Sequence, residues 1–198
     1  MTKHLLLSTT AILFSAGLAS AEVVLNRGND TDPATLDHHR TSTVAEGRVL
    51  GDLYEGLMTQ DATGKAVAGA AESWTVSDDG LVYTFKLRAD AKWSNGDPVT
   101  AEDFSFAFHR IMDPAIAAGY ASILYAIKNA EEVNTGKAPL DQLGVKAVDA
   151  QTLEITLHTP TPYFLELLTH QTGFPLHKAS VEANGDKYTQ PGTMVTNG

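Results

Sequence analysis

The stretch that decides the fold of this chain is Lys92-Trp93-Ser94-Asn95-Gly96-Asp97-Pro98-Val99-Thr100-Ala101-Glu102-Asp103-Phe104. Its first half predicts a tight loop, because Asn, Gly and Pro in close succession favour turns. Its second half predicts the start of a helix, since Thr100 stands three residues before Asp103, the spacing of a capping box. Trp93 lies in the loop half, and we expect it to line a cleft rather than to pack in the core.

The helix that follows this loop is predicted to bury one side. Phe104, Phe108, Ile111 and Met112 recur at helical spacing. Asp113-Pro114 ends the helix, because proline cannot continue the ladder of backbone hydrogen bonds. The buried side indicates a layer of sheet or helix beneath it.

Two antiparallel hairpins are predicted on either side of this helix. The first covers Ala71–Leu87 with Asp78-Asp79-Gly80 as its turn, and its second arm alternates apolar and polar residues as a half-buried strand does. The second hairpin covers Val145–Leu157 and turns at Asp149-Ala150-Gln151. Hairpins interleaved with helices are typical of a mixed α/β chain.

Four further elements complete the predicted fold. A first strand is expected over Glu22–Asn26 and a helix over Val44–Leu57, which Thr43 and Glu46 cap. Further elements are a helix that starts at Thr161-Pro162 and carries Tyr163, Phe164, Leu167 and Leu168, and a short helix over Lys178–Ala183 that ends at Asn184-Gly185.

The N-terminus has the pattern of a secretory signal peptide. Lys3 and His4 are followed by a mostly apolar stretch up to Leu18, and Leu18-Ala19-Ser20-Ala21 provides small residues for cleavage after Ala21. A transmembrane anchor is the alternative, but an apolar run of ~14 residues is short for a hydrocarbon layer of ~30 Å. We therefore expect residues 1–21 to be removed and the rest to be exported to a periplasm, without a membrane span.

Composition narrows the classes of function. The chain has 198 residues, no cysteine and a net charge of −10. The absence of cysteine means no disulfide and no thiolate metal site. The acidic balance argues against nucleic acid and anionic membranes as partners.

Motifs of catalysis and cofactor binding are weak. No dinucleotide-binding loop, phosphate loop or nucleophile elbow is present. Asp37-His38-His39 is the one cluster that suggests a metal or a hydrolase, but adjacent histidines on an extended segment point to opposite faces. We expect no metal, no cofactor and no catalysis, and keep an exported hydrolase using these three residues as an alternative.

The order of motifs resembles a known family. The motifs are Asp52-Leu53-Tyr54-Glu55-Gly56-Leu57, Ala71-Glu72-Ser73-Trp74, Tyr83-Thr84-Phe85-Lys86-Leu87-Arg88, the stretch from Lys92 to Phe104, Pro162-Tyr163-Phe164, and the tail from Gly185 to Gly198. Together they resemble the extracytoplasmic solute-binding proteins of ABC importers, in the peptide/nickel-binding family and its oligopeptide-binding branch. The murein-tripeptide binder is a sibling that these motifs do not separate.

The resemblance implies a fold of the α/β class. Members of the family are two-lobed clamshells of the type II periplasmic-binding-protein architecture with an extra domain. The chain would then be an N-terminal fragment of a longer protein. Residues 22–53 would start the first lobe, 54–177 would form the extra domain, and 178–198 would return into the first lobe.

The resemblance also implies a binding site. In relatives, the segment before the first helix pairs with the ligand backbone as an added strand does, and Ser42, Thr43 and Val44 match that segment. Relatives carry an acidic residue where this chain has Ser42, so a charge contact from that position is not carried over. Tyr120 and His170 match positions that line the pockets for ligand side chains. The implied partners are an oligopeptide and an ABC permease, with a monomer as the full-length form.

Several alternatives remain open at the level of sequence. The ligand of such a protein is an oligopeptide in the main interpretation, and a dipeptide, a murein peptide or a nickel chelate in the alternatives. The extra domain could also act as an autonomous module that binds a protein partner. Binding of short peptides by the full-length protein would favour the peptide-binding interpretation over a nickel-chelate binder. Loss of activity on mutation of His38, with peptide binding unchanged, would favour the exported hydrolase.

Overall fold

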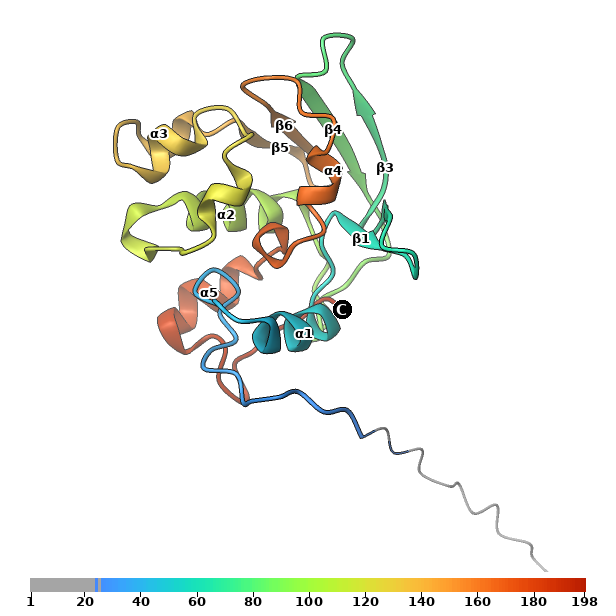
Figure 1. Ribbon diagram of the computed structural model, residues 1–198, viewed down its shortest axis with the longest axis vertical. Coiled ribbons are helices and arrows are strands. Elements are labelled where there is room, and N and C mark those ends of the chain that lie inside the picture. Colours follow the sequence, from blue (N-terminus) through green and yellow to red (C-terminus); the bar gives the residue numbers. More distant parts are fainter. Residues whose placement is uncertain (1–23, 25) are drawn as a thin grey trace, which may run out of the picture.

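The computed structural model describes residue 24 and residues 26–198, which form a mixed α/β body (Figure 1). The predicted signal peptide, residues 1–21, lies outside the described residues. So does most of the strand predicted over Glu22–Asn26, and the two described residues of that stretch, Val24 and Asn26, belong to no strand.

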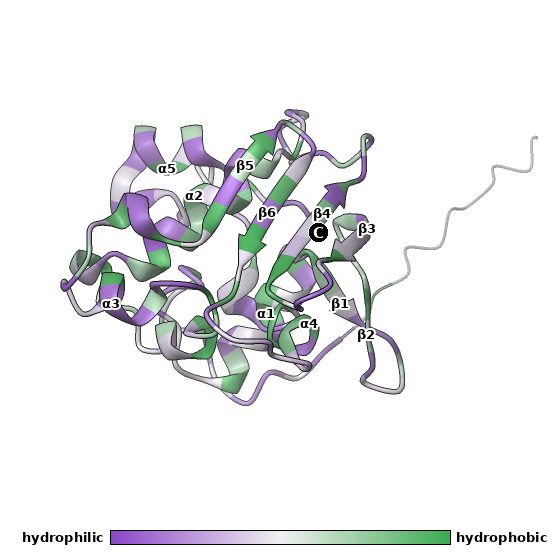
Figure 2. Ribbon diagram, turned by 90° about the horizontal axis from the view of Figure 1, so that it is seen from above, coloured by the Kyte–Doolittle hydropathy of each residue, from purple (hydrophilic) through white to green (hydrophobic). Residues whose placement is uncertain are grey.

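A four-stranded antiparallel sheet is the centre of the fold. Its strands are β3 (Ala71–Val76), β4 (Val82–Leu87), β6 (Thr152–Thr156) and β5 (Val145–Asp149), side by side in that order (Figure 2). Both predicted hairpins are thereby confirmed, and the pairing of β4 with β6 joins them. A smaller hairpin consists of β1 (Met58–Gln60) and β2 (Ala66–Ala68), and its turn includes Gly64, whose φ of 81° glycine adopts without strain.

The helices are short apart from two. They are α1 (Val44–Leu53), α2 (Ala101–Met112), α3 (Ala130–Asn134), α4 (Phe164–Leu167) and α5 (Lys178–Asn184). Single 3₁₀ turns cover Pro114–Ile116, Ala121–Leu124, Leu140–Gln142, Gln171–Gly173 and Gly185–Lys187.

Helix α2 packs against β5 and β6 and forms the core with them. Its four apolar residues predicted to be buried are all inaccessible: Phe104, Phe108, Ile111 and Met112. From the sheet, Phe85 and Leu153 pair across β4 and β6 and are fully buried. Burying each such side chain stabilises the fold by about 1.5–3 kcal/mol, so this layer is a substantial source of stability.

The prediction for Trp93 is wrong. Its side chain is 2% exposed and belongs to the core, not to a cleft. The indole N–H donates to Oδ2 of Asp103 at 3.2 Å, which satisfies the one polar atom of the ring and makes its burial favourable. The same oxygen accepts from the backbone N–H and the hydroxyl of Thr100, both at 2.9 Å, so the predicted capping pair also anchors the tryptophan.

Helix α1 ends earlier than predicted. It stops at Leu53, and Tyr54 is extended with φ −132° and ψ 148°. The backbone N–H and C=O of Glu55 instead bond to the side-chain amide of Asn197, at 3.1 and 2.9 Å. A residue far along the sequence therefore takes the backbone groups that would have continued the helix.

The helix predicted from Thr161-Pro162 is also shorter. Tyr163 is its N-cap, and only Phe164–Leu167 is helical. The hydroxyl of Thr161 donates back to the carbonyl of Thr159 at 3.0 Å, and the carbonyl of Thr161 accepts from Phe164 to close a turn. The predicted cap thus stabilises the turn before the helix.

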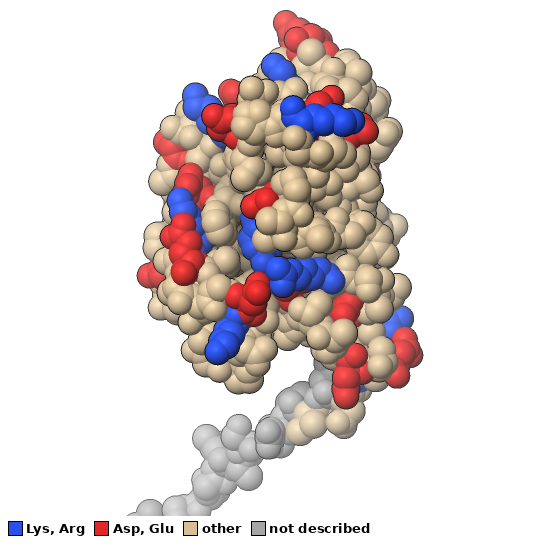
Figure 3. Space-filling view, turned by 90° about the vertical axis from the view of Figure 1, so that its left-hand side faces the viewer, with Lys and Arg blue, Asp and Glu red and all other residues tan. Residues whose placement is uncertain are grey.

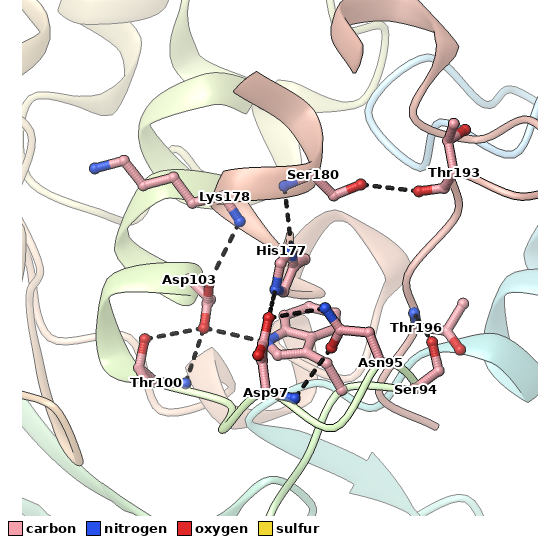
Figure 4. Close-up of polar contacts among 11 residues, drawn as sticks. Ser94, Asn95, Asp97, Thr100, Asp103, His177, Lys178, Ser180, Thr193 and Thr196 are labelled. Atoms are coloured by element: carbon pink, nitrogen blue, oxygen red, sulfur yellow. Dashed lines mark hydrogen bonds and ion pairs between the residues drawn. The ribbon is translucent and has the colours of Figure 1, made fainter. Parts of the chain in front are cut away.

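The final segment is tied back onto the stretch around Trp93, as Figure 4 shows. Ser94 exchanges two hydrogen bonds with the backbone of Thr196, at 2.7 and 3.1 Å. Nε2 of His177, the N-cap of α5, lies 2.9 Å from Oδ2 of Asp97. These contacts bring the C-terminal residues beside α1, where Gly198 N–H donates to Leu53 C=O at 3.0 Å (Figure 1).

The surface carries charges of both signs. On the face shown in Figure 3, acidic and basic side chains are interspersed and neither kind gathers into a broad patch. Lys178 and Glu102 form one such exposed pair at 2.9 Å. This distribution is typical of a solvated surface.

Candidate functional site

One surface pocket gathers all five residues that the sequence predicted to contact a ligand. Its volume is about 360 Å³. The lining residues are Ser42, Thr43, Val44, Gly47, Arg48, Tyr120, His170 and Gln171. They come from the N-terminal end of α1, from the residue before the 121–124 turn and from the start of the 171–173 turn.

Tyr120 and His170 form an aromatic rim. Their rings meet edge to face with centroids 5.9 Å apart. The hydroxyl of Tyr120 donates to the carbonyl of Ser42 at 3.4 Å, which ties the rim to the start of α1. Tyr120 is 42% exposed, so its ring offers apolar surface to a ligand.

His170 is held in one tautomer. Its Nδ1 accepts from the backbone N–H of Thr172 at 3.3 Å, so the proton of the neutral ring is on Nε2. Burial lowers the pKa of His170, which keeps the ring neutral at pH 7. His170 thus carries one ring N–H donor and no positive charge.

The side chain of Gln171, the first residue of the 171–173 turn, reaches toward α1 and the segment before it. Its Nε2 donates to Oγ1 of Thr41 at 2.7 Å. A Cβ at position 47 would lie 2.5 Å from Oε1 of Gln171, so any larger residue there would displace the Gln171 amide. Gly47 and Gln171 were not predicted, although Gly47 stands one helical turn after Thr43 and therefore shares its face.

The backbone of Ser42–Val44 is only partly available to a ligand. The buried carboxylate of Glu46 accepts from the N–H of Ser42 at 2.8 Å and from the N–H of Thr43 at 2.9 Å, so the predicted capping box is confirmed. Burial alone would raise the pKa of Glu46, but these backbone hydrogen bonds outweigh it and lower the pKa.

Within the described part of the chain, two main-chain groups of the Ser42–Val44 segment have no strong partner after capping. The first is the carbonyl of Ser42, whose one contact among the described residues is the long hydrogen bond from Tyr120. The second is the N–H of Val44, which as the first residue of α1 has no helical acceptor. The two groups lie two residues apart on extended backbone, so they face the same side, as the bonding groups of a strand do.

Arg48 is the charged member of the lining, and the sequence analysis missed it. Its Nη1 donates to Oδ2 of Asp30 at 2.6 Å, in a pair whose side chains are 43% and 80% exposed. The signal that could have found it is spacing, because Arg48 follows Val44 by four residues and lies on the same helical face.

The Asp37-His38-His39 cluster is buried and does not form a substrate site. Arg110 binds Asp37 through two hydrogen bonds of 3.0 and 2.7 Å, and its Nη1 lies 2.9 Å from Nδ1 of His39. Burial lowers the pKa of His38 to about 4. All three predicted residues are at most 6% exposed, so a substrate cannot reach them. The hydrolase alternative has no support from this geometry.

A second grouping, of Ser180, His177 and Asp97, resembles a catalytic triad only in composition (Figure 4). Nδ1 of His177 accepts from the backbone N–H of Ser180 at 3.1 Å. The hydroxyl of Ser180 donates instead to the carbonyl of Thr193 at 2.9 Å. Since the hydroxyl is not bonded to the imidazole, it is not activated as a nucleophile.

Two negative observations concern the described residues alone. Within residue 24 and residues 26–198, no three His, Asp or Glu side chains are placed to hold a metal ion. In the same part of the chain, the helices are all too short or too polar to cross a membrane.

Comparison with known proteins identifies the class. The family model described as Bacterial extracellular solute-binding proteins, family 5 Middle matches residues 65–198. The chain therefore belongs to this family of bacterial extracellular solute-binding proteins. The predicted family and the predicted α/β fold class of periplasmic binding proteins are confirmed.

Particular relatives narrow the comparison. The chain is 47% identical over 186 residues to the periplasmic oligopeptide-binding protein OppA of Escherichia coli (strain K12). This match covers 92% of this chain and 34% of that protein. It is 40% identical over 201 residues to the periplasmic murein peptide-binding protein MppA of the same organism, with coverages of 98% and 37%. The solved structure of Haemophilus influenzae OppA in complex with RPPGFSPFR matches with a TM-score of 0.83 at 46% identity, over 86% of this chain and 34% of that one. The chain thus spans about a third of the length of these relatives.

Proposed function

We propose that this chain forms one side of the ligand site of an oligopeptide-binding protein that serves an ABC importer. The observation that carries the proposal is the pair of main-chain groups at the pocket, the carbonyl of Ser42 and the N–H of Val44. Every peptide repeats one N–H and one C=O per residue, so contacts to these groups suit extended peptides of any sequence.

The walls of the pocket support the same ligand class. The neutral donor on His170 and the ring of Tyr120 flank the Ser42–Val44 segment. A side chain of a bound peptide would rest against this rim, while its main chain pairs with the start of α1. Two of the similar proteins named above bind peptides according to their names, and one was solved with a peptide.

The layout of the whole protein is part of the proposal. Residues 1–21 are a signal peptide cleaved after Ala21, and export delivers the rest to the periplasm. Residues 22–53 and 178–198 belong to the first lobe, and residues 54–177 form the extra domain. The remaining length, which the relatives have, would supply the opposite wall of the site.

The proposed mechanism is binding without catalysis. A ligand that contacts both lobes stabilises the closed form, because only that form offers both sets of contacts. The closed monomer then delivers the peptide to a membrane permease. This chain alone presents an open pocket, so we expect it to bind peptides weakly or not at all.

Calorimetric titration of the full-length protein tests the proposal. We expect binding of tripeptides to pentapeptides with 1:1 stoichiometry. A murein tripeptide is the second candidate ligand, favoured by the similarity to MppA, and a dipeptide and a nickel chelate complete the panel. Heat from a nickel chelate alone, with none from any peptide, would contradict the proposal.

A further inference from the structure

The charge of the pocket lining is uneven. Of the eight residues that line it, Arg48 alone carries a full charge, and no carboxylate is among them. His170 is kept neutral by burial, as its lowered pKa indicates. Arg48 is thus the one charged group of the lining, and its partner Asp30 lies outside the lining.

Arg48 lies within reach of the proposed main-chain contact. It follows Val44 by four residues on α1, and side chains at this spacing lie about 5–6 Å apart at their Cβ atoms. A peptide whose carbonyl accepts from Val44 N–H would place an adjacent side chain, or its own C-terminus, beside the guanidinium.

The guanidinium has hydrogen-bonding capacity left. Only Nη1 donates to a partner among the described residues, and that partner, Asp30, does not line the pocket. The ion pair is exposed on both sides, and exposed pairs contribute little to stability. A ligand carboxylate can therefore bind the free donors or displace Asp30 at little cost.

We propose that Arg48 makes this pocket selective for peptides with a carboxylate at the position next to the main-chain contact. This inference rests on the proposed function, because it concerns the same pocket. The carboxylate comes from an Asp or Glu side chain or from the C-terminus of the peptide. Arg48 is thus a specificity-determining residue that adds a charge contact to sequence-independent pairing.

The experiment measures peptide affinities of the full-length protein by calorimetry. The probes are alanine tetrapeptides with Glu or Gln at each position in turn, each with a free or an amidated C-terminus. We expect one Glu position, or the free C-terminus, to improve affinity about fivefold over its neutral counterpart, with the advantage shrinking as salt is added. Which arm shows the advantage identifies the source of the carboxylate.

Three variants separate the role of Arg48 from general effects. Arg48→Gln is expected to abolish the advantage, whereas Arg48→Lys is expected to keep part of it. Arg27→Gln is the matched control. Arg27 pairs with Asp52, which lies on α1 as Arg48 does, but Arg27 does not line this pocket. It removes the same charge and should preserve the advantage.

The outcomes distinguish the inference from the function on which it rests. If peptides bind but neither Glu over Gln nor a free over an amidated C-terminus improves the affinity, or if Arg48→Gln keeps the difference, the inference is overturned and the peptide-binding function stands. If no peptide binds, the proposed function fails and takes the inference with it.

Discussion

Oδ2 of Asp103 accepts the indole N–H of Trp93 at 3.2 Å, and this contact joins the loop of residues 92–98 to helix α2. Three donors converge on the one oxygen, while Oδ1 accepts from Lys178 N–H at 3.4 Å (Figure 4). Asp103 therefore holds the loop, the start of α2 and the start of α5 together.

Asp103→Asn is expected to destabilise the protein by about 2 kcal/mol, because hydrogen bonds to a charged acceptor are lost and an amide N–H₂ meets donors. Trp93→Phe, which removes only the indole N–H and part of the ring, is expected to cost less. Urea unfolding measures both. Equal stability of Asp103→Asn and wild type would mean that the three donors are satisfied without the charge.

Breaking the buried ion pair of Asp37 and Arg110 is expected to lower the stability of the fold strongly. Arg110→Met leaves the carboxylate buried without its partner and is expected to cost about 3–5 kcal/mol. The double variant Asp37→Leu/Arg110→Met removes both charges and should recover much of that loss. A double variant as unstable as the single one would argue that packing, not charge, is responsible.

We expect the folded protein to lose stability in mild acid because of the buried His38. Burial lowers its pKa from 6.5 to about 4, so between these values the unfolded chain binds a proton that the folded chain does not. Stability therefore falls as the pH falls through this window, by about 3 kcal/mol from this one residue. The lowered pKa of His39 acts in the same direction, whereas the lowered pKa of Asp37 affects stability only below its ordinary value of 3.8.

Unfolding in urea at several pH values between 7 and 4.5 tests this prediction. His38→Leu keeps the ring's volume approximately and removes the titrating group, so its stability should depend less on pH than that of wild type. An unchanged slope in the variant would show that other groups cause the acid sensitivity.

Two glycines with opposite surroundings give paired predictions. A Cβ at Gly69 would lie 2.6 Å from the backbone oxygen of Gly56, and backbone cannot move aside, so Gly69→Ala is expected to cost about 2 kcal/mol or more. Gly51 lies within α1 with nothing within 4 Å of its Cβ position, so Gly51→Ala should stabilise by about 0.5–1 kcal/mol. Thermal unfolding of both variants checks the signs, and a stabilised Gly69→Ala would refute the close approach.

Features with local causes could be predicted from the sequence. The hairpins follow from alternating residues around Asp78-Asp79-Gly80 and Asp149-Ala150-Gln151, and the caps follow from the spacing of Thr43 to Glu46. Features with distant causes could not. Helix α1 ends just before Glu55, whose backbone bonds to Asn197, a contact between residues 142 positions apart in the sequence.

The candidate site shows the same division. The resemblance to a known family supplied Ser42, Thr43, Val44, Tyr120 and His170, and the structure brings all five to one pocket. It did not supply Arg48, which helical spacing from Val44 could have indicated. It also did not supply Gln171, whose place in the lining depends on how α1 packs against the 171–173 turn. Nor could it indicate that Glu46 occupies the N–H groups of Ser42 and Thr43.

The most direct test of peptide binding through the main chain is the affinity of Val44→Pro in the full-length protein. Proline is favoured at the first position of a helix, and Thr43 already has the extended backbone that precedes a proline, so α1 should persist and only the N–H is lost. Val44→Ala is the control, because it removes the exposed side chain and keeps the N–H. The account predicts an affinity at least about tenfold weaker for Val44→Pro and unchanged within about twofold for Val44→Ala. Equal peptide affinity of Val44→Pro and wild type, with the helix intact by circular dichroism, would contradict it.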